Sequence, residues 1–252
     1  MFFQDVWFLL QKYYPLFLSG IGFTLLIAIS GTVIGFLIGL LVAVVRTIPV
    51  SDNDGALKKA IFKIVQFVCV AYIEVFRGTP MMIQASVIYF GLFMGIDINI
   101  IVVAVFVVSI NTGAYMAEII RGGIISVDKG QTEGAHSIGM THWQTMTSVV
   151  LPQAIRNIMP SVGNEFVVNI KDTSVLNVIG VAELYFQAKS AAGAYAMFFQ
   201  SFSISAVIYF ILTFTVTRLL RIVERRMDGP GSYKIFGSQT DVNAEIHIKE
   251  GV

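Results

Sequence analysis

Charged and amide side chains interrupt an otherwise apolar stretch, residues 158–180, of this 252-residue chain. At membrane depth a charge costs roughly 2.5–3.5 kcal/mol, so charges that persist there are typical of functional sites. Lys171 and Asp172 offer both signs of charge, which suits a solute that carries an ammonium and a carboxylate group. Asn164 and Glu165 lie about two helical turns earlier. We expect these four residues to contribute to a substrate site or gate; a structural ion pair at a helix end is the alternative.

A second group of polar residues lies on the preceding apolar segments. Asn111, Tyr115 and Glu118 follow an i, i+4, i+7 spacing and therefore share one face of a helix. We predict that Asn111 lines the same pathway, and that Gln84, on an earlier segment, does so too. Hydrogen bonding between helices is the alternative for both, because polar side chains often serve that purpose in membrane bundles.

Other kinds of site chemistry find little support in the sequence. His136 and His142 do not share a helical face, so we expect no metal site. The chain has no Gly-x-x-x-x-Gly-Lys-Ser/Thr phosphate loop, so ATP hydrolysis is expected of another polypeptide. A single cysteine, Cys69, excludes a disulfide within the chain. We therefore expect a protein that is not an enzyme and holds no cofactor of its own.

The composition indicates a membrane protein. Hydrophobic residues make up 56% of the chain, charged residues only 13%, and the mean hydropathy is +0.76. A soluble domain is nearer half apolar and a quarter charged. So much apolar surface cannot be buried in one soluble core of this size, whereas a bilayer accommodates it. The net charge of +1 gives no indication of a nucleic-acid partner.

Apolar runs long enough to cross a bilayer, about 20 residues each, recur along the chain. The sequence predicts an all-α integral membrane protein with about five transmembrane helices. Thr79 is predicted to be the N-cap of one helix, with Pro80 at its first position. Whether the weaker segment 61–76 before it spans the membrane or lies along it stays open. The predicted segments are 16–45, 80–93, 98–117, 158–180 and 203–220.

Three glycines repeat at every fourth position of the first apolar segment. Gly31, Gly35 and Gly39 therefore lie on one face of a helix and allow another helix to approach closely. We expect this face to pack against a helix of the same chain rather than to form a seam between two copies.

Basic residues cluster in three segments that alternate crossings place on one side of the membrane. By the positive-inside rule this side is the cytoplasm, so the N-terminus is expected outside and the C-terminus inside. The clusters are Arg46, Lys58, Lys59 and Lys63; Arg121, Lys129 and Arg156; and Arg218, Arg221, Arg225 and Arg226.

The loop of residues 128–152, on the basic side, predicts two short helices. Asp128 and Gln131 have the spacing of a capping box, so the first helix should begin there. Gly139 is well placed to end it in a left-handed conformation. Thr141 and Gln144 repeat the capping spacing, so a second helix should follow at once.

This loop could lie on the bilayer surface or dock on a partner protein. Gly130 and Gly134 leave one helical face nearly bare, and Glu133 is an acid that the first turns of a helix tolerate. Both features favour docking. Pro152 and Pro160 are expected to punctuate the segment that follows.

The loop resembles the EAA loop of ATP-binding-cassette (ABC) importer permeases, whose pattern is Glu-Ala-Ala-x-x-x-Gly, nine residues and Ile-x-Leu-Pro. Here Glu133-Gly134-Ala135, Gly139 and the Val-Val-Leu-Pro of residues 149–152 stand at the matching spacing. Gly134 replaces the usual alanine, at a cost of about 0.5–1 kcal/mol of helix stability. The resemblance implies that Glu133, Gly134, Ala135 and Gly139 couple the chain to an ATPase.

Further stretches, which together cover most of residues 16–226, resemble the polar amino acid branch of that superfamily. They are Glu-Val-Phe-Arg-Gly-Thr-Pro at 74–80, Gly-Asn at 163–164, Lys-Asp-Thr-Ser at 171–174 and Glu-Leu at 183–184. The resemblance implies a fold like that of a type I ABC importer permease. We expect a transmembrane permease domain at 1–227, with the coupling loop at about 128–152, and a polar tail at 228–252 to which we assign no fold.

The resemblance also implies partners and a location. It implies uptake of polar amino acids, such as glutamine, glutamate or arginine, across a prokaryotic plasma membrane. A second permease subunit, identical or related, would complete the pathway, and an external or periplasmic solute-binding protein would deliver the solute. A cytoplasmic ATPase would bind ATP and Mg²⁺, and its cycle would drive alternation between outward and inward access.

Two other functions stay open on the residues alone. A secondary carrier or channel for small polar solutes would use the polar residues of the spans without ATP. A membrane scaffold would carry no solute at all. The capped loop with its Leu-Pro ending favours the importer.

Overall fold

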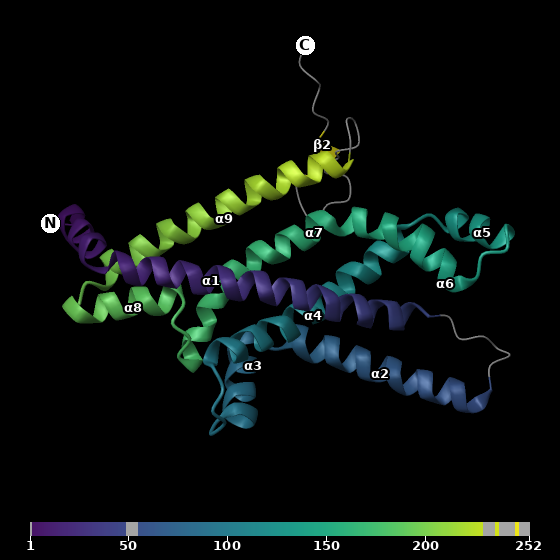
Figure 1. Ribbon diagram of the computed structural model, residues 1–252, viewed down its shortest axis with the longest axis horizontal. Helices are drawn as coiled ribbons and strands as arrows, with labels where there is room; N and C mark the ends of the chain where they lie inside the picture. Colours follow the sequence, from purple (N-terminus) through teal and green to yellow (C-terminus); the bar gives the residue numbers. More distant parts are fainter. Residues whose placement is uncertain (1, 49–54, 229–234, 237–244, 247–252) are drawn as a thin grey trace, which may run out of the picture.

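The computed structural model describes residues 2–48, 55–228, 235–236 and 245–246, and most of these residues are helical (Figure 1). Five of the helices have 22 residues or more: α1 (Phe2–Thr47), α2 (Ala56–Gly78), α4 (Ile100–Ser126), α7 (Leu151–Asp172) and α9 (Phe198–Asp228). Shorter helices connect them: α3 (Met81–Ile88), α5 (Lys129–Ser137), α6 (His142–Thr145) and α8 (Leu184–Tyr195).

Three of the long helices, α1, α4 and α9, are also apolar enough to cross a membrane by length and composition. The helices α2 and α7 are long enough too but carry more charge, as in the lysines near the start of α2. Four of the five long helices correspond to predicted spans, whereas the predicted span 80–93 is the shorter run of α3 and the π-helical turn after it, and α2 contains the segment 61–76 that the sequence left open. The predicted segment 158–180 is displaced, because α7 begins at Leu151 and ends at Asp172, and Thr173–Ile179 form a 3₁₀ helix.

The first helix begins much earlier than the predicted position 16. α1 runs from Phe2 and continues through Pro15, although a proline inside a helix removes one backbone hydrogen bond. Leu9 and Phe17 are buried in one apolar cluster with residues of α8 and α9. Packing on both sides of the proline therefore keeps this part of the chain helical, and the ribbon changes direction within the N-terminal part of α1 (Figure 1).

The glycine face of α1 lies directly against α4. A Cβ atom added at Gly31 would lie 2.4 Å from Val108, one at Gly35 would lie 2.7 Å from Thr112, and one at Gly39 would lie 2.5 Å from Met116. The partners on α4 also stand at every fourth position, so they share one face of that helix. The glycine face of α1 therefore packs against this face of α4. The prediction that the glycines pack within one chain is confirmed.

A buried amide ties α7 to this pair of helices. The Asn169 Nδ2 donates to the Thr32 Oγ1 at 2.8 Å, and the Thr112 Oγ1 donates to the Asn169 Oδ1 at 3.1 Å. All three side chains are buried. Because a buried amide is costly unless it is hydrogen-bonded, this contact fixes the rotation of α7 against both helices.

The chain breaks its helical path between α2 and α3. Thr79 is extended, with φ −123° and ψ 147°, as the residue before a proline prefers. The predicted N-cap is therefore wrong: Pro80 takes the cap position, and the Thr79 hydroxyl donates backward to the Val75 carbonyl at 2.8 Å. The helical run does reach Phe93 as predicted, because α3 continues into a π-helical turn, Tyr89–Phe93.

The ends of the helices that carry the basic clusters lie toward one end of the molecule (Figure 1). The end of α1 and the start of α2 lie there together with α5 and α6, and α9 also runs toward that end. The N-terminus and α8 lie at the opposite end. Most of the tail, 228–252, lies outside the described residues; within it β1 (Ile235–Phe236) pairs antiparallel with β2 (Glu245–Ile246).

We predict that Gly39→Ala lowers the free energy of unfolding by about 1–3 kcal/mol, the usual cost of overpacking a core. The added Cβ would lie 2.5 Å from the Met116 Cβ and 2.8 Å from the Ala117 nitrogen, so the backbone of α4 would have to move. Unfolding of the detergent-solubilised chain, followed by circular dichroism, measures the change.

Gly22→Ala is the matched control on the same helix, because a Cβ there meets no atom within 4 Å. Alanine is favoured over glycine in a helix, so this variant should be as stable as the parent or more stable. An equal loss in both variants would contradict the close packing of α1 on α4.

Candidate functional site

The loop after α4 begins with a capped helix, as the sequence predicts, but with a different cap. The Asp128 carboxylate accepts a hydrogen bond from the Gly130 nitrogen at 2.7 Å, whereas the predicted capping box would have used the Gln131 nitrogen. A Cβ at Gly130 would lie only 2.7 Å from the same carboxylate oxygen. Because Gly130 has no side chain, the Asp128 carboxylate can bond the Gly130 nitrogen, one residue earlier than the predicted Gln131 nitrogen.

The turn between α5 and α6 matches its prediction closely. Gly139 has a φ of +86°, the left-handed conformation expected of a glycine that ends a helix. The Thr141 and Gln144 capping box is also confirmed: the Gln144 nitrogen donates to the Thr141 Oγ1 at 3.3 Å, and the Thr141 nitrogen donates to the Gln144 Oε1 at 2.9 Å. Local side-chain chemistry thus defines both sides of the turn.

The helix α5 turns one face inward and one outward. Ala135 is buried, whereas Glu133, Gly134 and Gly139 are exposed. The exposed residues leave the outward face of α5 nearly free of bulky side chains. Such a face allows the backbone of a partner to come close, with one carboxylate, that of Glu133, as the charged contact.

Two large apolar side chains at this turn were not singled out from the sequence. Ile138 is 79% exposed and Trp143 is 66% exposed, on either side of Gly139. Their positions beside the two helix caps could have revealed them, because side chains next to a tight turn have few neighbours of their own. Exposed aromatic and aliphatic side chains of this kind are typical anchors of a protein interface.

The chain continues from this turn into the membrane segment without a break. α6 passes through a π-helical turn, Met146–Val150, directly into α7. The predicted interruption at Pro152 and Pro160 does not occur. Pro152 directly follows the π-helical turn, and Pro160 is accommodated inside α7.

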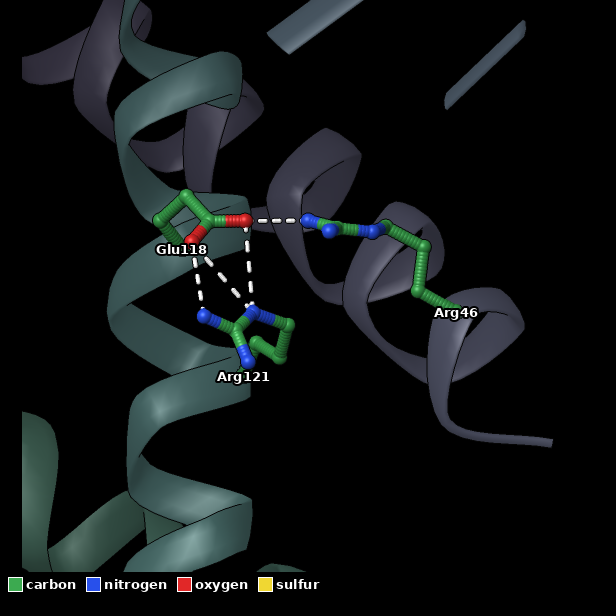
Figure 2. A network of polar contacts seen from close by, with 3 residues as sticks. All are labelled: Arg46, Glu118 and Arg121. Carbon is green, nitrogen blue, oxygen red and sulfur yellow. Dashed lines mark hydrogen bonds and ion pairs between the residues drawn. The ribbon is translucent and has the colours of Figure 1, made fainter. Parts of the chain in front are cut away.

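An ion cluster joins the ends of α1 and α4 just before this loop (Figure 2). The Glu118 carboxylate accepts hydrogen bonds from Arg46 of α1 and from Arg121 of its own helix, whose Nη2 lies 3.0 Å from the Glu118 Oε2. The three side chains are only about a fifth to a third exposed. The cluster therefore fixes the end of α1 to the helix that leads into the loop.

The predicted pathway residues of α7 separate onto two sides. The charged groups that act on the half-buried Glu165 carboxylate are Asp172, on the same face, and Arg77 of α2. The Arg77 guanidinium also lies 5.5 Å from the Tyr115 ring centroid. Glu165 and Asp172 thus belong to a polar surface shared by α2, α4 and α7.

The other two predicted residues of α7, Asn164 and Lys171, are exposed and line grooves between α7 and α9. Lys171 and Asp172 are adjacent and therefore point about 100° apart on the helix, but the Lys171 charge still acts on the Asp172 carboxylate, so their role as a pair stays a prediction. The structure brings Glu165 together with Asp172 and not with Lys171.

Gln84 of α3 and Asn111 of α4 meet beside the bend between α2 and α3. The Asn111 Nδ2 donates to the Gln84 Oε1 at 2.8 Å, and the Gln84 Nε2 donates to the carbonyls of Phe76 and Thr79, each at 2.8 Å. Both amides are buried. This is the bonding between helices that the sequence allowed as the alternative; a contact of either residue with a solute stays a prediction.

A buried acid at the opposite end of the molecule was not singled out as a buried group from the sequence. Glu183 is fully buried, and its carboxylate accepts hydrogen bonds from the Tyr185 nitrogen at 2.8 Å, the Phe186 nitrogen at 2.7 Å and the Tyr209 hydroxyl at 2.8 Å. Burial raises the pKa of this carboxyl, and the three donors oppose that rise. Glu183 thus caps α8 and ties it to α9.

Among the described residues, no three His, Cys, Asp or Glu side chains gather where a metal ion would be held. The candidate site therefore consists of two parts: the capped turn with its bare helical face, and the polar surface of α7. The continuous helical run through α6 and α7 connects them.

Comparison with known proteins supports one family. The model of the family described as "Binding-protein-dependent transport system inner membrane component" matches residues 55–229. The chain is 38% identical over 227 residues to the glutamine transport system permease protein GlnP of Escherichia coli, with 89% of this chain and 98% of that protein covered. It is 32% identical to the arginine transport system permease protein ArtQ of Bacillus subtilis, with 84% and 93% covered.

Solved structures agree with this similarity. A chain of an amino acid ABC transporter crystallised with histidines superposes with a TM-score of 0.75 at 42% identity, covering 86% of this chain and 96% of that one. A chain of the inward-facing MetNI methionine ABC transporter superposes with a TM-score of 0.64 at 19% identity, covering 83% and 97%. The second similarity shows the fold alone.

We predict opposite effects of one substitution at two glycines of the loop. Gly139→Ala should destabilise the end of α5 by about 1–2 kcal/mol, because an alanine is strained at positive φ. Gly134→Ala should stabilise α5 by about 0.5–1 kcal/mol, because Gly134 is helical and a Cβ there meets no atom within 4 Å. Hydrogen exchange of the α5 amides in the detergent-solubilised chain measures both. Slower exchange in the Gly139 variant would contradict the assigned turn.

Proposed function

The chain belongs to the family of binding-protein-dependent transport system inner membrane components, and we propose that it is the permease subunit of an ABC importer for polar amino acids. The observation that carries the proposal is the capped turn, which presents Glu133 and Gly134 on an exposed helical face at the end of the molecule where the basic clusters gather. A self-sufficient carrier has no need of such a face.

The solute class follows from two independent lines of support. The relatives GlnP and ArtQ are described as glutamine and arginine transport permeases. Glu165, Asp172 and Arg77 place both signs of charge on one polar surface of α2 and α7, which suits the ammonium and carboxylate groups of an amino acid. A secondary carrier, the alternative from the residues alone, receives no support from these similarities.

The partners belong to the same proposal. The Glu133 face would dock on a separate ATPase that binds ATP and Mg²⁺, so this chain holds neither. A solute-binding protein on the outer side would deliver the amino acid, and a second permease subunit, identical or related, would complete the pathway. The basic clusters would face the cytoplasm, with the N-terminus outside and the C-terminus inside.

The geometry suggests how ATPase movement reaches the solute. A shift of the docked α5 would pass through the turn at Gly139 to α6 and from there directly to α7, because α6 continues into α7 without a loop. It is also passed to α4, which is fixed to α1 by the Glu118 cluster. The polar surface of α7 would then turn between the outer and inner sides as the helices move.

We predict that Glu133→Ala lowers the ATPase activity stimulated by loaded binding protein about tenfold in liposomes that contain the chain with its ATPase and binding protein. The physical reason is the loss of one charge-assisted contact, worth about 1.5–3 kcal/mol. Asp97→Asn is the control, because it removes an exposed carboxylate outside the loop. Equal activities of parent and Glu133 variant, with uptake driven by an ion gradient, would overturn the importer.

We predict that Asp172→Asn and Glu165→Gln each raise the KM for amino acid uptake about tenfold, since each removes one charge from the polar surface. Glu74→Gln is the control, an exposed acid on α2 one turn before Arg77, and should leave the KM within twofold. Uptake kinetics in the reconstituted complex measure the effect. Unchanged KM values in both α7 variants would assign these carboxylates to structure alone.

A further inference from the structure

A groove between α7 and α9 is not used by the proposed transport function. It has a volume of about 240 Å³ and is lined by side chains of both helices. At its edge the helices touch, because a Cβ at Gly163 of α7 would lie 3.2 Å from Leu220 of α9. The groove is therefore formed by the packing of these two helices and is not a gap at a chain end.

The lining of the groove is strongly cationic. Lys171, Arg218 and Arg221 all line it, and no acid stands among the described residues that do. A smaller groove of about 180 Å³ adjoins it and shares Arg221; there Glu224 supplies one negative charge. Even with that acid counted, three cations against one carboxylate leave an excess of positive charge, which favours an anionic ligand.

The remaining lining is apolar and aromatic. Phe210 and Phe214 line the same groove, and the Arg218 guanidinium lies 4.9 Å from the Phe214 ring centroid. This contact places the cation beside the aromatic lining of the groove. A ligand that fits must therefore combine an anionic group with an apolar body.

The position of the groove identifies the source of such a ligand. No residue in the most apolar stretch of α9 is buried, so the groove lies beside a helix that faces the bilayer. About 20 residues cross the hydrocarbon, so a span that starts near Phe198 ends close to Arg218. Arg218 and Arg221 then lie at the headgroup level, Lys171 lines the same groove from α7, and the phenylalanines lie at the level of the acyl chains.

We propose that the groove between α7 and α9 binds an anionic phospholipid, whose phosphate is held by Lys171, Arg218 and Arg221 and whose acyl chain packs on Phe210 and Phe214. Basic pockets between transmembrane helices on the cytoplasmic side commonly bind anionic headgroups. The site is separate from the Glu165 and Asp172 surface and from the Glu133 face. It ties the angle between α7 and α9 to the lipid composition of the membrane.

The test uses a photoreactive phosphatidylglycerol and the purified full-length chain in phosphatidylcholine vesicles, with crosslinked peptides located by mass spectrometry. Crosslinks are expected on the peptides of α7 and α9, and unlabelled phosphatidylglycerol should displace the probe whereas added phosphatidylcholine should not. Arg218→Gln with Arg221→Gln should weaken binding about thirtyfold, the loss expected for two cations near an anionic headgroup.

Arg225→Gln with Arg226→Gln is the matched control, because it removes two arginines from the same helix end that do not line either groove. It should change binding less than threefold. Equal losses in the two double variants would overturn the site and leave only a general attraction of basic residues to the membrane.

Two further outcomes would also overturn the proposal. Displacement of the probe by free glycerol phosphate would show a site for any small anion. The absence of lipid crosslinks from both α7 and α9 would show that the groove does not face the lipid. Retained phosphatidylglycerol crosslinks on both helices in the parent and in the control variant would support it.

Discussion

The close approach of α1 and α4 is the constraint from which the other helices take their positions. Glycines on α1 bring the two backbones together, and Thr32 and Thr112 on the same pair then receive Asn169 of α7. At the other end of α1, Gly20 allows the start of α8 to approach: a Cβ there would lie 2.8 Å from the Leu184 Cα. One helix with small residues on its packing faces thus holds α4, α7 and α8.

The functional parts of the molecule depend on that arrangement. α4 leads directly into the proposed coupling turn, and the Glu118 cluster keeps the end of α1 beside α4 (Figure 2). α7 begins where the turn ends, and its position against α1 and α4 is set by Asn169. The two helices that flank the turn, α4 and α7, are therefore packed together. A force applied at Glu133 would act on both of them.

Local chemistry made part of this structure predictable from the sequence. Gly139 needs a positive φ, the Thr141 and Gln144 side chains satisfy each other's backbone, and glycines at every fourth position must face something close. The features that the sequence did not predict depend on packing between residues far apart in the chain. Pro15 stays helical because neighbouring side chains are buried. Glu183 lies in a polar segment near the outer end, and only the tertiary fold brings Tyr209 to it.

The candidate site shows the same division. The EAA pattern places the proposed coupling residues by spacing alone, because they follow one another on one short helix and the turn that ends it. The pathway residues of α7 could be grouped by face but not assigned to neighbours, since the sequence does not state which helices α7 lies between. Lys171 and Asp172 were predicted as one pair; in the structure Lys171 lines the groove beside α9, and Asp172 lies on the face of α7 that carries Glu165.

The unbroken helical run from His142 to Asp172 acts mechanically as a lever arm. At about 1.5 Å per residue, Glu165 lies about 35 Å from the coupling turn. A tilt of about 5° at the turn therefore displaces the Glu165 level sideways by about 3 Å, close to the width of a hydrogen bond. Pro160, which withdraws one backbone hydrogen bond along the way, is the point where the arm would bend under load. In the proposed importer, small movements of a docked ATPase would thereby be amplified into a displacement as large as a polar contact.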